Sequence, residues 1–156
     1  MIEKLASLVD QVGALQSKLV LLIGTPQSGK TGLLHSLAKL KSVTPLNVGA
    51  ELGSRLAGMP QRLRRLQTTP ILRELSEQYA HGDLLLLDNI EILFDRSLKL
   101  DPLDLLKRHA HARRVVAVWP GELQGDARTG RLTYADMGHP EHQDYGIAGV
   151  VPFEIQ

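Results

Sequence analysis

Residues 18–40 read KLVLLIGTPQSGKTGLLHSLAKL, and this stretch decides the fold. The apolar run at 19–23 predicts a parallel strand that is buried on both faces. Apolar residues at helical spacing after Lys30 predict a helix. Between them, the segment from Gly24 to Thr31 matches the P-loop pattern G-x-x-x-x-G-K-[ST] at every defined position. Strand, glycine-rich loop and helix therefore follow one another in the order that a phosphate-binding site requires.

The residue types in this loop suit a triphosphate. Glycines let the backbone approach phosphate oxygens, and successive amide N–H groups together with the start of a helix attract an anion. Lys30 is expected to reach the β- and γ-phosphates, and the Thr31 hydroxyl is expected to bind Mg²⁺. The expected nucleotide-binding residues are Gly24, Thr25, Pro26, Gln27, Ser28, Gly29, Lys30, Thr31 and Gly32.

A second apolar run supplies a carboxylate. Leucines at 84–87 precede Asp88, as expected of a buried strand that delivers one carboxylate to Mg²⁺ at its carboxyl-terminal edge. We therefore expect Asp88 to bind the metal together with Thr31, and ATP and Mg²⁺ to be the cofactors. No Asn-Lys-x-Asp guanine reader is present, so ATP is expected rather than GTP.

The residue that would activate water is less clear. Many P-loop ATPases place Glu directly after this Asp, whereas here the position holds Asn89, whose amide can orient water but cannot accept its proton. Glu91 is the nearest carboxylate, and it either comes within reach through a turn after Asp88 or is an ordinary surface residue. The candidate catalytic residues are therefore Lys30, Asp88, Asn89 and Glu91, and slow hydrolysis is expected.

The rest of the chain alternates between helical and strand patterns. Amphipathic helices are predicted over 2–16 and after Asp101-Pro102, with helical segments at 50–57 and at 61–80, the latter broken near Pro70. Strands are predicted at 45–48, 115–119, 132–135 and 150–155, and Pro152 indicates an edge position for the last. Residues 121–130 are predicted to be a polar loop.

This order predicts an α/β fold, a three-layer sandwich with a mainly parallel sheet. We expect one P-loop NTPase domain over residues 1–156, with no room for a C-terminal lid. Trp119 occupies a strand end where such ATPases often carry a polar γ-phosphate sensor. Five residues near the end resemble a metal-ligand set, although their spacing suits no single helical face: Asp136, His139, Glu141, His142 and Asp144.

Composition excludes several classes of protein. The 156 residues include no cysteine, so neither a disulfide framework nor a thiolate metal site can form. No apolar run reaches membrane-spanning length, and the charged residues Glu3, Lys4 and Asp10 interrupt any signal-peptide pattern. A cytoplasmic location is expected. The net charge of +1 favours no particular partner.

An arginine-rich stretch between Leu52 and Arg73 contains no acidic residue. It is either a solvated basic face, or a source of an arginine that acts on a neighbouring subunit's γ-phosphate, or a contact for a nucleic-acid backbone. The arginines concerned are Arg55, Arg62, Arg64, Arg65 and Arg73.

The segment LLLLDNIEILF at 84–94 resembles the corresponding region of AAA+ initiator-type ATPases. Together with the N-terminal helix, the P-loop and the ending YADMGHPEH at 134–142, the whole chain resembles the BrxF family of small P-loop proteins from BREX phage-defence systems. This resemblance implies an ATP-binding component of a bacterial defence complex that works with larger partners, among them DNA-modifying ones.

Three functions fit these features. The first is an ATPase that forms homo-oligomers and couples its nucleotide state to assembly with other phage-defence proteins. The second is a nucleotide-gated adaptor that binds ATP and scarcely hydrolyses it, which Asn89 and Trp119 favour. The third is a small-metabolite kinase, in which Arg128 and Arg131 would act as lid arginines.

Overall fold

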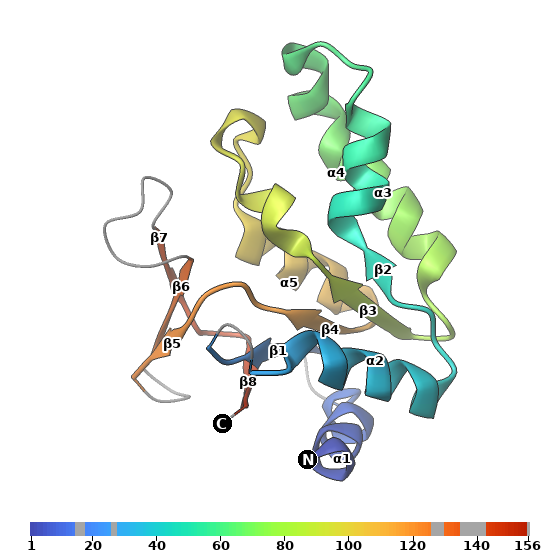
Figure 1. Ribbon diagram of the computed structural model, residues 1–156, viewed down its shortest axis with the longest axis vertical. Coiled ribbons are helices and arrows are strands. Elements are labelled where there is room, and N and C mark those ends of the chain that lie inside the picture. The colour runs from blue at the N-terminus through green and yellow to red at the C-terminus, as the bar shows by residue number, and fades with distance from the viewer. Residues whose placement is uncertain (15–17, 26–27, 126–129, 135–142, 156) are drawn as a thin grey trace.

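The computed structural model describes residues 1–14, 18–25, 28–125, 130–134 and 143–155. A five-stranded sheet with the order β2-β3-β4-β1-β8 forms its centre (Figure 1), and all neighbouring strands run parallel. The predicted mainly parallel α/β fold is therefore confirmed, and β8 lies at an edge as Pro152 indicated. The strands are β1 Leu19–Ile23, β2 Leu46–Asn47, β3 Leu84–Asp88, β4 Arg114–Val118 and β8 Val151–Glu154.

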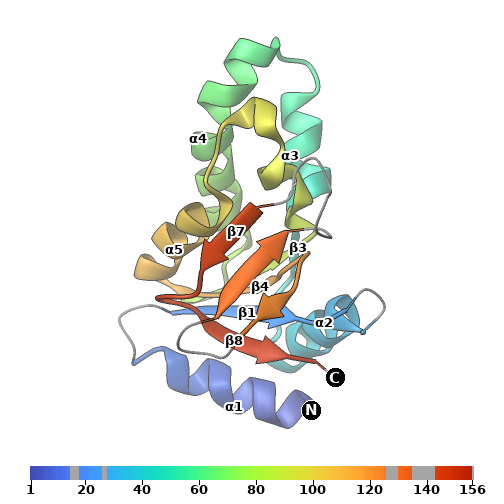
Figure 2. The ribbon, with the colours of Figure 1, turned by 90° about the vertical axis from the view of Figure 1, so that its left-hand side faces the viewer.

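Helices cover both faces of this sheet, because the strands carry apolar side chains on both sides (Figures 1 and 2). Val20 and Leu22 of β1 pack with α1 and α2 on one face. Leu19, Leu21 and Ile23 pack with α3, α4 and α5 on the other, so the fold has three layers. The helices are α1 Ile2–Val12, α2 Lys30–Lys41, α3 Val48–Leu56, α4 Gln61–Tyr79 and α5 Pro102–Ala112.

Several predicted boundaries differ from the structure by one to four residues, and two of these differences have a clear local cause. The first helix ends at Val12 rather than at residue 16, because Gly13 begins a turn. The predicted strand at 45–48 is shorter, because the Asn47 side chain accepts a hydrogen bond from the Ala50 amide (3.0 Å) and so starts α3 at the next residue.

The break predicted near Pro70 is wrong, because α4 continues through this residue. Proline removes one backbone donor from a helix. Pro70 itself is exposed, whereas Ile71, Leu72 and Leu75 on the other side of the helix are buried. Burial of that apolar side stabilises the continuous helix by more than the missing hydrogen bond costs.

A second, three-stranded antiparallel sheet was not predicted. It contains β5 Leu123–Gln124, β6 Arg131–Tyr134 and β7 Gln143–Gly146, in the order β5-β6-β7. The strand predicted at 132–135 therefore belongs to this sheet and does not close the main one. The expected polar loop at 121–130 also contains a short strand. The second sheet lies beside the main sheet, on the side to which β4 runs (Figure 1).

The indole of Trp119 joins the two sheets. Its ring is fully buried and makes edge-to-face contacts with Phe94 (5.3 Å between centroids) and Tyr145 (5.6 Å). Its Nε1–H donates to the Thr133 carbonyl of β6 at 2.9 Å. This buried polar bond fixes how the second sheet sits against the end of β4.

Substituting Gly121 with alanine is expected to lower the free energy of unfolding by about 3 kcal/mol. An added Cβ would lie 1.4 Å from the Thr133 carbonyl oxygen, so β6 would have to move away. Chemical denaturation measures this change. Gly58→Ala is the matched control, because its Cβ meets nothing within 4 Å; equal effects of the two substitutions would contradict the close packing at Gly121.

Most of the suggested metal-ligand set near the C-terminus, Asp136, His139, Glu141 and His142, lies outside the described residues. Asp144 belongs to β7, and its side chain is also outside the description. Within the described ranges, no three His, Cys, Asp or Glu side chains gather as metal ligands would. No described helix is both long and apolar enough to cross a membrane.

Candidate functional site

The loop between β1 and α2 is shaped by its glycines. Gly29 has a φ of +92°, a left-handed conformation that glycine adopts without strain. A Cβ on Gly24 would lie 2.5 Å from the Ser28 hydroxyl oxygen and 3.1 Å from the Ile155 carbonyl oxygen, so this position also requires glycine. The predicted loop residues Pro26 and Gln27 lie outside the described residues.

Several polar groups of this loop lack an internal partner. The Ser28 hydroxyl is buried and makes no hydrogen bond within the described part of the chain. No described side chain caps the start of α2, and the first-turn amides of a helix have no partner within the helix. A buried hydroxyl and these amides are the donors that an anion such as phosphate would accept from. The loop therefore fits a phosphate ligand.

Lys30 holds its ammonium group against two backbone carbonyls. Its Nζ donates to the carbonyl of Gly24 (3.0 Å) and to that of Trp119 (2.9 Å). Burial lowers the pKa of Lys30 below its ordinary value, while the negative charges of Glu91 and Glu122 act in the opposite direction. The Lys30 ammonium thus lies between the loop and the end of β4. A bound phosphate group would replace the two neutral carbonyls as its hydrogen-bond partner.

The two expected magnesium ligands lie together. The Thr31 hydroxyl donates to Asp88 Oδ1 at 3.3 Å, across 57 positions of sequence. Asp88 Oδ1 also accepts from the Asn89 amide at 2.9 Å, which fixes the carboxylate. A hydroxyl and a carboxylate oxygen at the end of a parallel strand are ligands that Mg²⁺ prefers, so this pair fits the metal.

His35 is a further polar residue of this site that the sequence analysis did not predict. Its Nε2 lies 3.5 Å from Asp88 Oδ2. His35 follows Thr31 by one helical turn, so both side chains leave α2 on the same face. The four-residue spacing from Thr31 is the sequence feature that indicates this position for His35. It places the imidazole beside the Asp88 carboxylate, which would bind the metal.

Asn89 and Glu91 follow different courses after β3. Asn89 has a φ of +53° and turns the chain into the 3₁₀-helix η1 (Ile90–Phe94). Its side-chain amide donates to Asn47 Oδ1 at 3.1 Å, and its carbonyl accepts from the Gly49 amide at 2.9 Å. Asn89 therefore connects β3 to the start of α3. Glu91 lies exposed in the first turn of η1, close enough to act on the Lys30 charge.

Glu122 is a second carboxylate near Lys30 and was not predicted. It follows β4, and its backbone is paired with Thr133 through N–H···O bonds of 3.2 and 2.8 Å. The end of β4 was considered only for a polar sensor at Trp119. Since the carboxyl ends of parallel strands meet at one edge, a carboxylate just beyond β4 can approach Lys30. A cavity of about 250 Å³ next to the loop is lined by Ile23, Gly24, Thr25, Glu122, Leu123, Glu154 and Ile155.

The arginine-rich stretch divides into structural and exposed members. Arg55 lies 3.4 Å from Glu74, and Arg64 donates to the backbone carbonyls of Met59 (2.8 Å) and Ala57 (3.2 Å), so these two arginines hold α3 and α4 together. Arg62, Arg65 and Arg73, all on α4, are exposed and make no ion pair with a described residue, whereas the exposed Arg55 has Glu74 as its partner. Of the two arginines considered for a kinase lid, Arg131 is exposed on β6 and Arg128 lies outside the described residues.

No protein-family model matches this sequence, and no curated protein matches it significantly. Among solved structures, a DNA replication initiation factor is similar to it, with a TM-score of 0.50 and 16% sequence identity. The similar region covers 99% of this chain and 44% of that protein's chain. The chain therefore spans less than half of that protein's length, and the likeness concerns the fold.

Proposed function

We propose that this chain binds ATP together with Mg²⁺ and hydrolyses the nucleotide slowly. One observation carries the proposal. The Thr31 hydroxyl and the Asp88 carboxylate lie 3.3 Å apart, at the end of the loop that starts at Gly24 and holds Lys30. This places an ammonium group, a pair of oxygen ligands and a helix start at the carboxyl edge of one parallel sheet, which is the edge where such folds bind ligands.

Each group has a defined task in this proposal. The loop amides and the Ser28 hydroxyl donate to the phosphate oxygens, and Lys30 exchanges its carbonyl partners for the β- and γ-phosphates. Thr31 and Asp88 hold Mg²⁺, which when bound neutralises charge that develops on the phosphates. Glu91 accepts the proton of the attacking water, because Asn89 cannot accept one.

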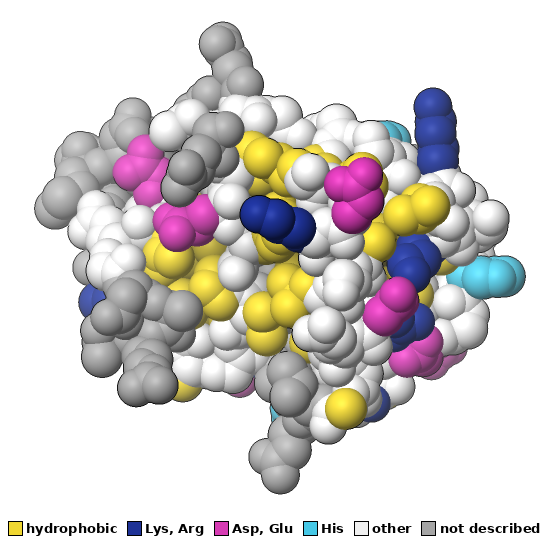
Figure 3. Space-filling view, turned by 90° about the horizontal axis from the view of Figure 1, so that it is seen from below, with side chains coloured by type: hydrophobic (Ala, Val, Ile, Leu, Met, Phe, Trp, Pro, Cys, Tyr) yellow, Lys and Arg dark blue, Asp and Glu magenta, His cyan; other side chains and the backbone are white. Residues whose placement is uncertain are grey.

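Oligomerisation and a role in phage defence are parts of the same proposal. The resemblance to the BREX proteins supports the second part. Hydrophobic side chains gather in the middle of the surface on the side of α1 and the termini (Figure 3), which supports a subunit contact there. Partly exposed apolar residues next to the core on this side of the sheet include Ile2, Leu8, Leu33, Val151 and Phe153. An arginine from a neighbouring copy would then complete the site.

A nucleotide-gated adaptor that does not hydrolyse ATP is the second candidate. Asn89 favours it, because its side chain is occupied by Asn47 and holds β3 to α3. Under this alternative, nucleotide binding alone would control assembly with a partner.

The deciding experiment gives purified protein ATP or GTP and measures phosphate release and particle mass together. A rate of phosphate release per protein molecule that rises with protein concentration supports an oligomeric ATPase. ATP-dependent assembly without phosphate release supports the adaptor. Absence of both binding and release would refute the proposal.

Glu91→Gln is expected to lower ATP turnover about 100-fold, as loss of a general base does, while ATP affinity stays within about twofold. Steady-state phosphate release and equilibrium nucleotide binding measure the two effects. Glu154→Gln is the control, because Glu154 is an exposed carboxylate that lines the neighbouring cavity, whereas the carboxylates whose charges act on Lys30 are Glu91 and Glu122. Unchanged turnover in Glu91→Gln, with a loss in Glu122→Gln, would move the role to Glu122.

A further inference from the structure

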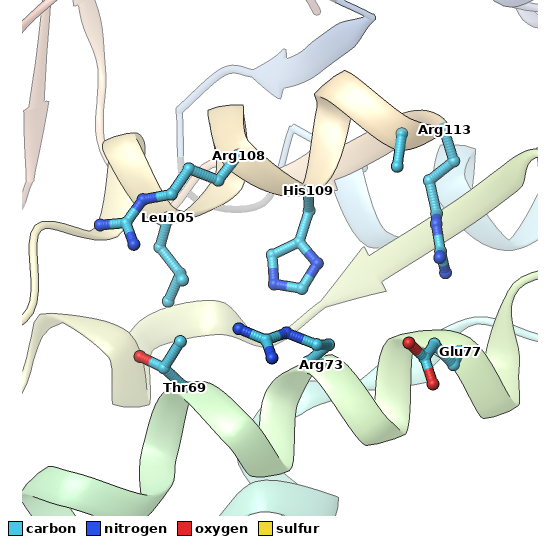
Figure 4. Close-up of a pocket in the computed structure, with 8 residues that line it drawn as sticks. Thr69, Arg73, Glu77, Leu105, Arg108, His109 and Arg113 are labelled. Carbon is cyan, nitrogen blue, oxygen red and sulfur yellow. The ribbon is translucent and has the colours of Figure 1, made fainter.

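A cavity of about 290 Å³ lies between α4 and α5, on the sheet face opposite α2 (Figure 4). Arg73 and Glu77 enter it from α4, Arg108 and His109 enter it from α5, and Arg113 enters it from the turn after α5. Glu77 is the only carboxylate among its described lining residues. Basic groups therefore outnumber acidic ones in a hollow that the nucleotide site does not use.

The arginine charges in this cavity are only partly neutralised. Arg108 is paired, since its guanidinium donates to Asp104 at 2.9 and 2.7 Å. Arg113 donates to the Ser76 carbonyl at 3.1 Å, which is a neutral acceptor, and its guanidinium points toward Glu77 in Figure 4 without a described ion pair. Arg73 makes no ion pair with any residue that the structure describes. Arg73 on α4 and Arg113, which directly follows α5, thus line one hollow, and both keep guanidinium donors that no described residue uses.

His109 reports the same excess of positive charge. Burial lowers its pKa, and the charges of Arg113, Arg73 and Arg108 lower it further. In Figure 4 the imidazole points from α5 toward Arg73 on α4. An anion between these two side chains would relieve the repulsion.

We propose that this cavity binds a phosphate group, held by the guanidinium of Arg73 with His109 beside it, while the charge of Arg113 at the other end of the hollow adds to the attraction. Guanidinium groups recognise phosphate through paired N–H donors, and charge-assisted bonds of this kind are stronger than neutral ones. The cavity exceeds the volume of one phosphate, and Leu105 supplies an apolar wall. The phosphate therefore belongs to a larger ligand, either a small phosphorylated compound or a nucleic-acid strand.

A second basic hollow on α4 allows a small phosphorylated compound to be distinguished from a nucleic-acid strand. Arg62, Arg65 and Lys99 line a cavity of about 340 Å³. Arg65 and Arg73 are eight residues apart on one helix, which corresponds to about 12 Å along its axis. A nucleic-acid backbone would contact both hollows, whereas a small phosphorylated compound would occupy only the one at Arg73.

The test follows the imidazole signals of the 156-residue protein by NMR in two separate titrations. One titration adds inorganic phosphate, and the other adds a ten-nucleotide oligothymidylate. We expect phosphate to raise the pKa of His109, because the anion offsets the surrounding arginines. Arg73→Gln is expected to weaken this response about tenfold or more. Lys39→Gln is the control, since it removes one exposed positive charge on the opposite face of the sheet.

Each outcome decides the proposal. A response to phosphate that requires Arg73 but not Arg65 supports a small phosphorylated ligand. An oligonucleotide response that is weakened by both Arg73→Gln and Arg65→Gln supports a nucleic-acid strand. A His109 signal that responds to neither titrant, or that responds equally in wild type and Arg73→Gln, overturns the proposal. The P-loop does not confuse the result, because its own phosphate response would persist in Arg73→Gln.

The lowered pKa of His109 also predicts how pH affects stability. The unfolded chain takes up a proton near pH 6.5, before folded His109 does, so folding favours the neutral imidazole. This contribution is complete above about pH 6.5 and is lost as the pH falls toward the lowered pKa. Phosphate in the cavity should reduce this pH-dependent loss of unfolding free energy in wild type but not in Arg73→Gln. Thermal unfolding between about pH 7 and pH 5, with and without phosphate, measures the difference.

Discussion

Replacing Lys30 with alanine is expected to weaken ATP binding by at least about 100-fold and to abolish measurable hydrolysis. The ammonium group is held at the loop by only two neutral carbonyls, those of Gly24 and Trp119, at 3.0 and 2.9 Å. It is therefore available to phosphate oxygens, with which it would form charge-assisted bonds in a half-buried site. Equilibrium binding of a fluorescent ATP analogue and phosphate release measure the two losses.

The same helix supplies a matched control for this substitution. Lys39 is exposed near the other end of α2, so Lys39→Ala removes an equal charge without touching the loop. Its nucleotide affinity should stay within about twofold of wild type. The melting temperature of both variants establishes that each is folded. A folded Lys30→Ala protein that keeps wild-type ATP affinity would refute the proposed nucleotide site.

Asp88→Asn is expected to lower Mg²⁺-dependent turnover by at least about 100-fold while nucleotide affinity without Mg²⁺ changes little. Asparagine has the same shape, and its carbonyl oxygen still accepts from Thr31 and from the Asn89 amide. The fold is therefore retained and only the negative charge of the metal ligand is lost. Turnover and nucleotide affinity measured against Mg²⁺ concentration report this loss.

Asp101→Asn serves as the control for that experiment. Asp101 caps α5 by accepting from the Asp104 amide at 3.1 Å, and asparagine caps helices equally well. Its Mg²⁺ dependence should match that of wild type. If the Asp88 variant showed the same Mg²⁺ dependence as this control, Asp88 would not be the metal ligand.

The elements that the sequence predicted correctly are those that local chemistry specifies. The apolar runs at 19–23, 84–87 and 115–119 correspond to the central strands β1, β3 and β4, the last shifted by one residue, because each run is buried on both faces. Asp101-Pro102 marked the start of α5 because the carboxylate caps it and proline suits a first turn. In each case the residues that determine the element lie within it or beside it.

The elements that were missed depend on distant partners. Pro70 would end an isolated helix, but tertiary burial of Leu72 and Leu75 keeps α4 continuous. The strands of the second sheet are short, and what positions them is the indole of Trp119 against Thr133. Neither effect leaves a periodic pattern in the sequence near the element that it determines.

The candidate site divides in the same way. The loop from Gly24 to Thr31 was predictable because its motif is contiguous, and Asp88 because a buried strand ends there. The position of Glu122 near Lys30 was not predicted, because it depends on how the chain turns after β4. The sequence also gave no sign that a backbone carbonyl at Trp119 would receive the lysine.

Because this carbonyl belongs to Trp119, intrinsic tryptophan fluorescence can report on the state of the loop. Trp119 is the only tryptophan in the chain, and its backbone oxygen accepts from the Lys30 ammonium while its indole is enclosed by Phe94 and Tyr145. A ligand that draws the lysine away changes the electric field at this one fluorophore. Intrinsic emission, excited selectively at the indole, should therefore follow occupancy of the loop in real time without any attached dye.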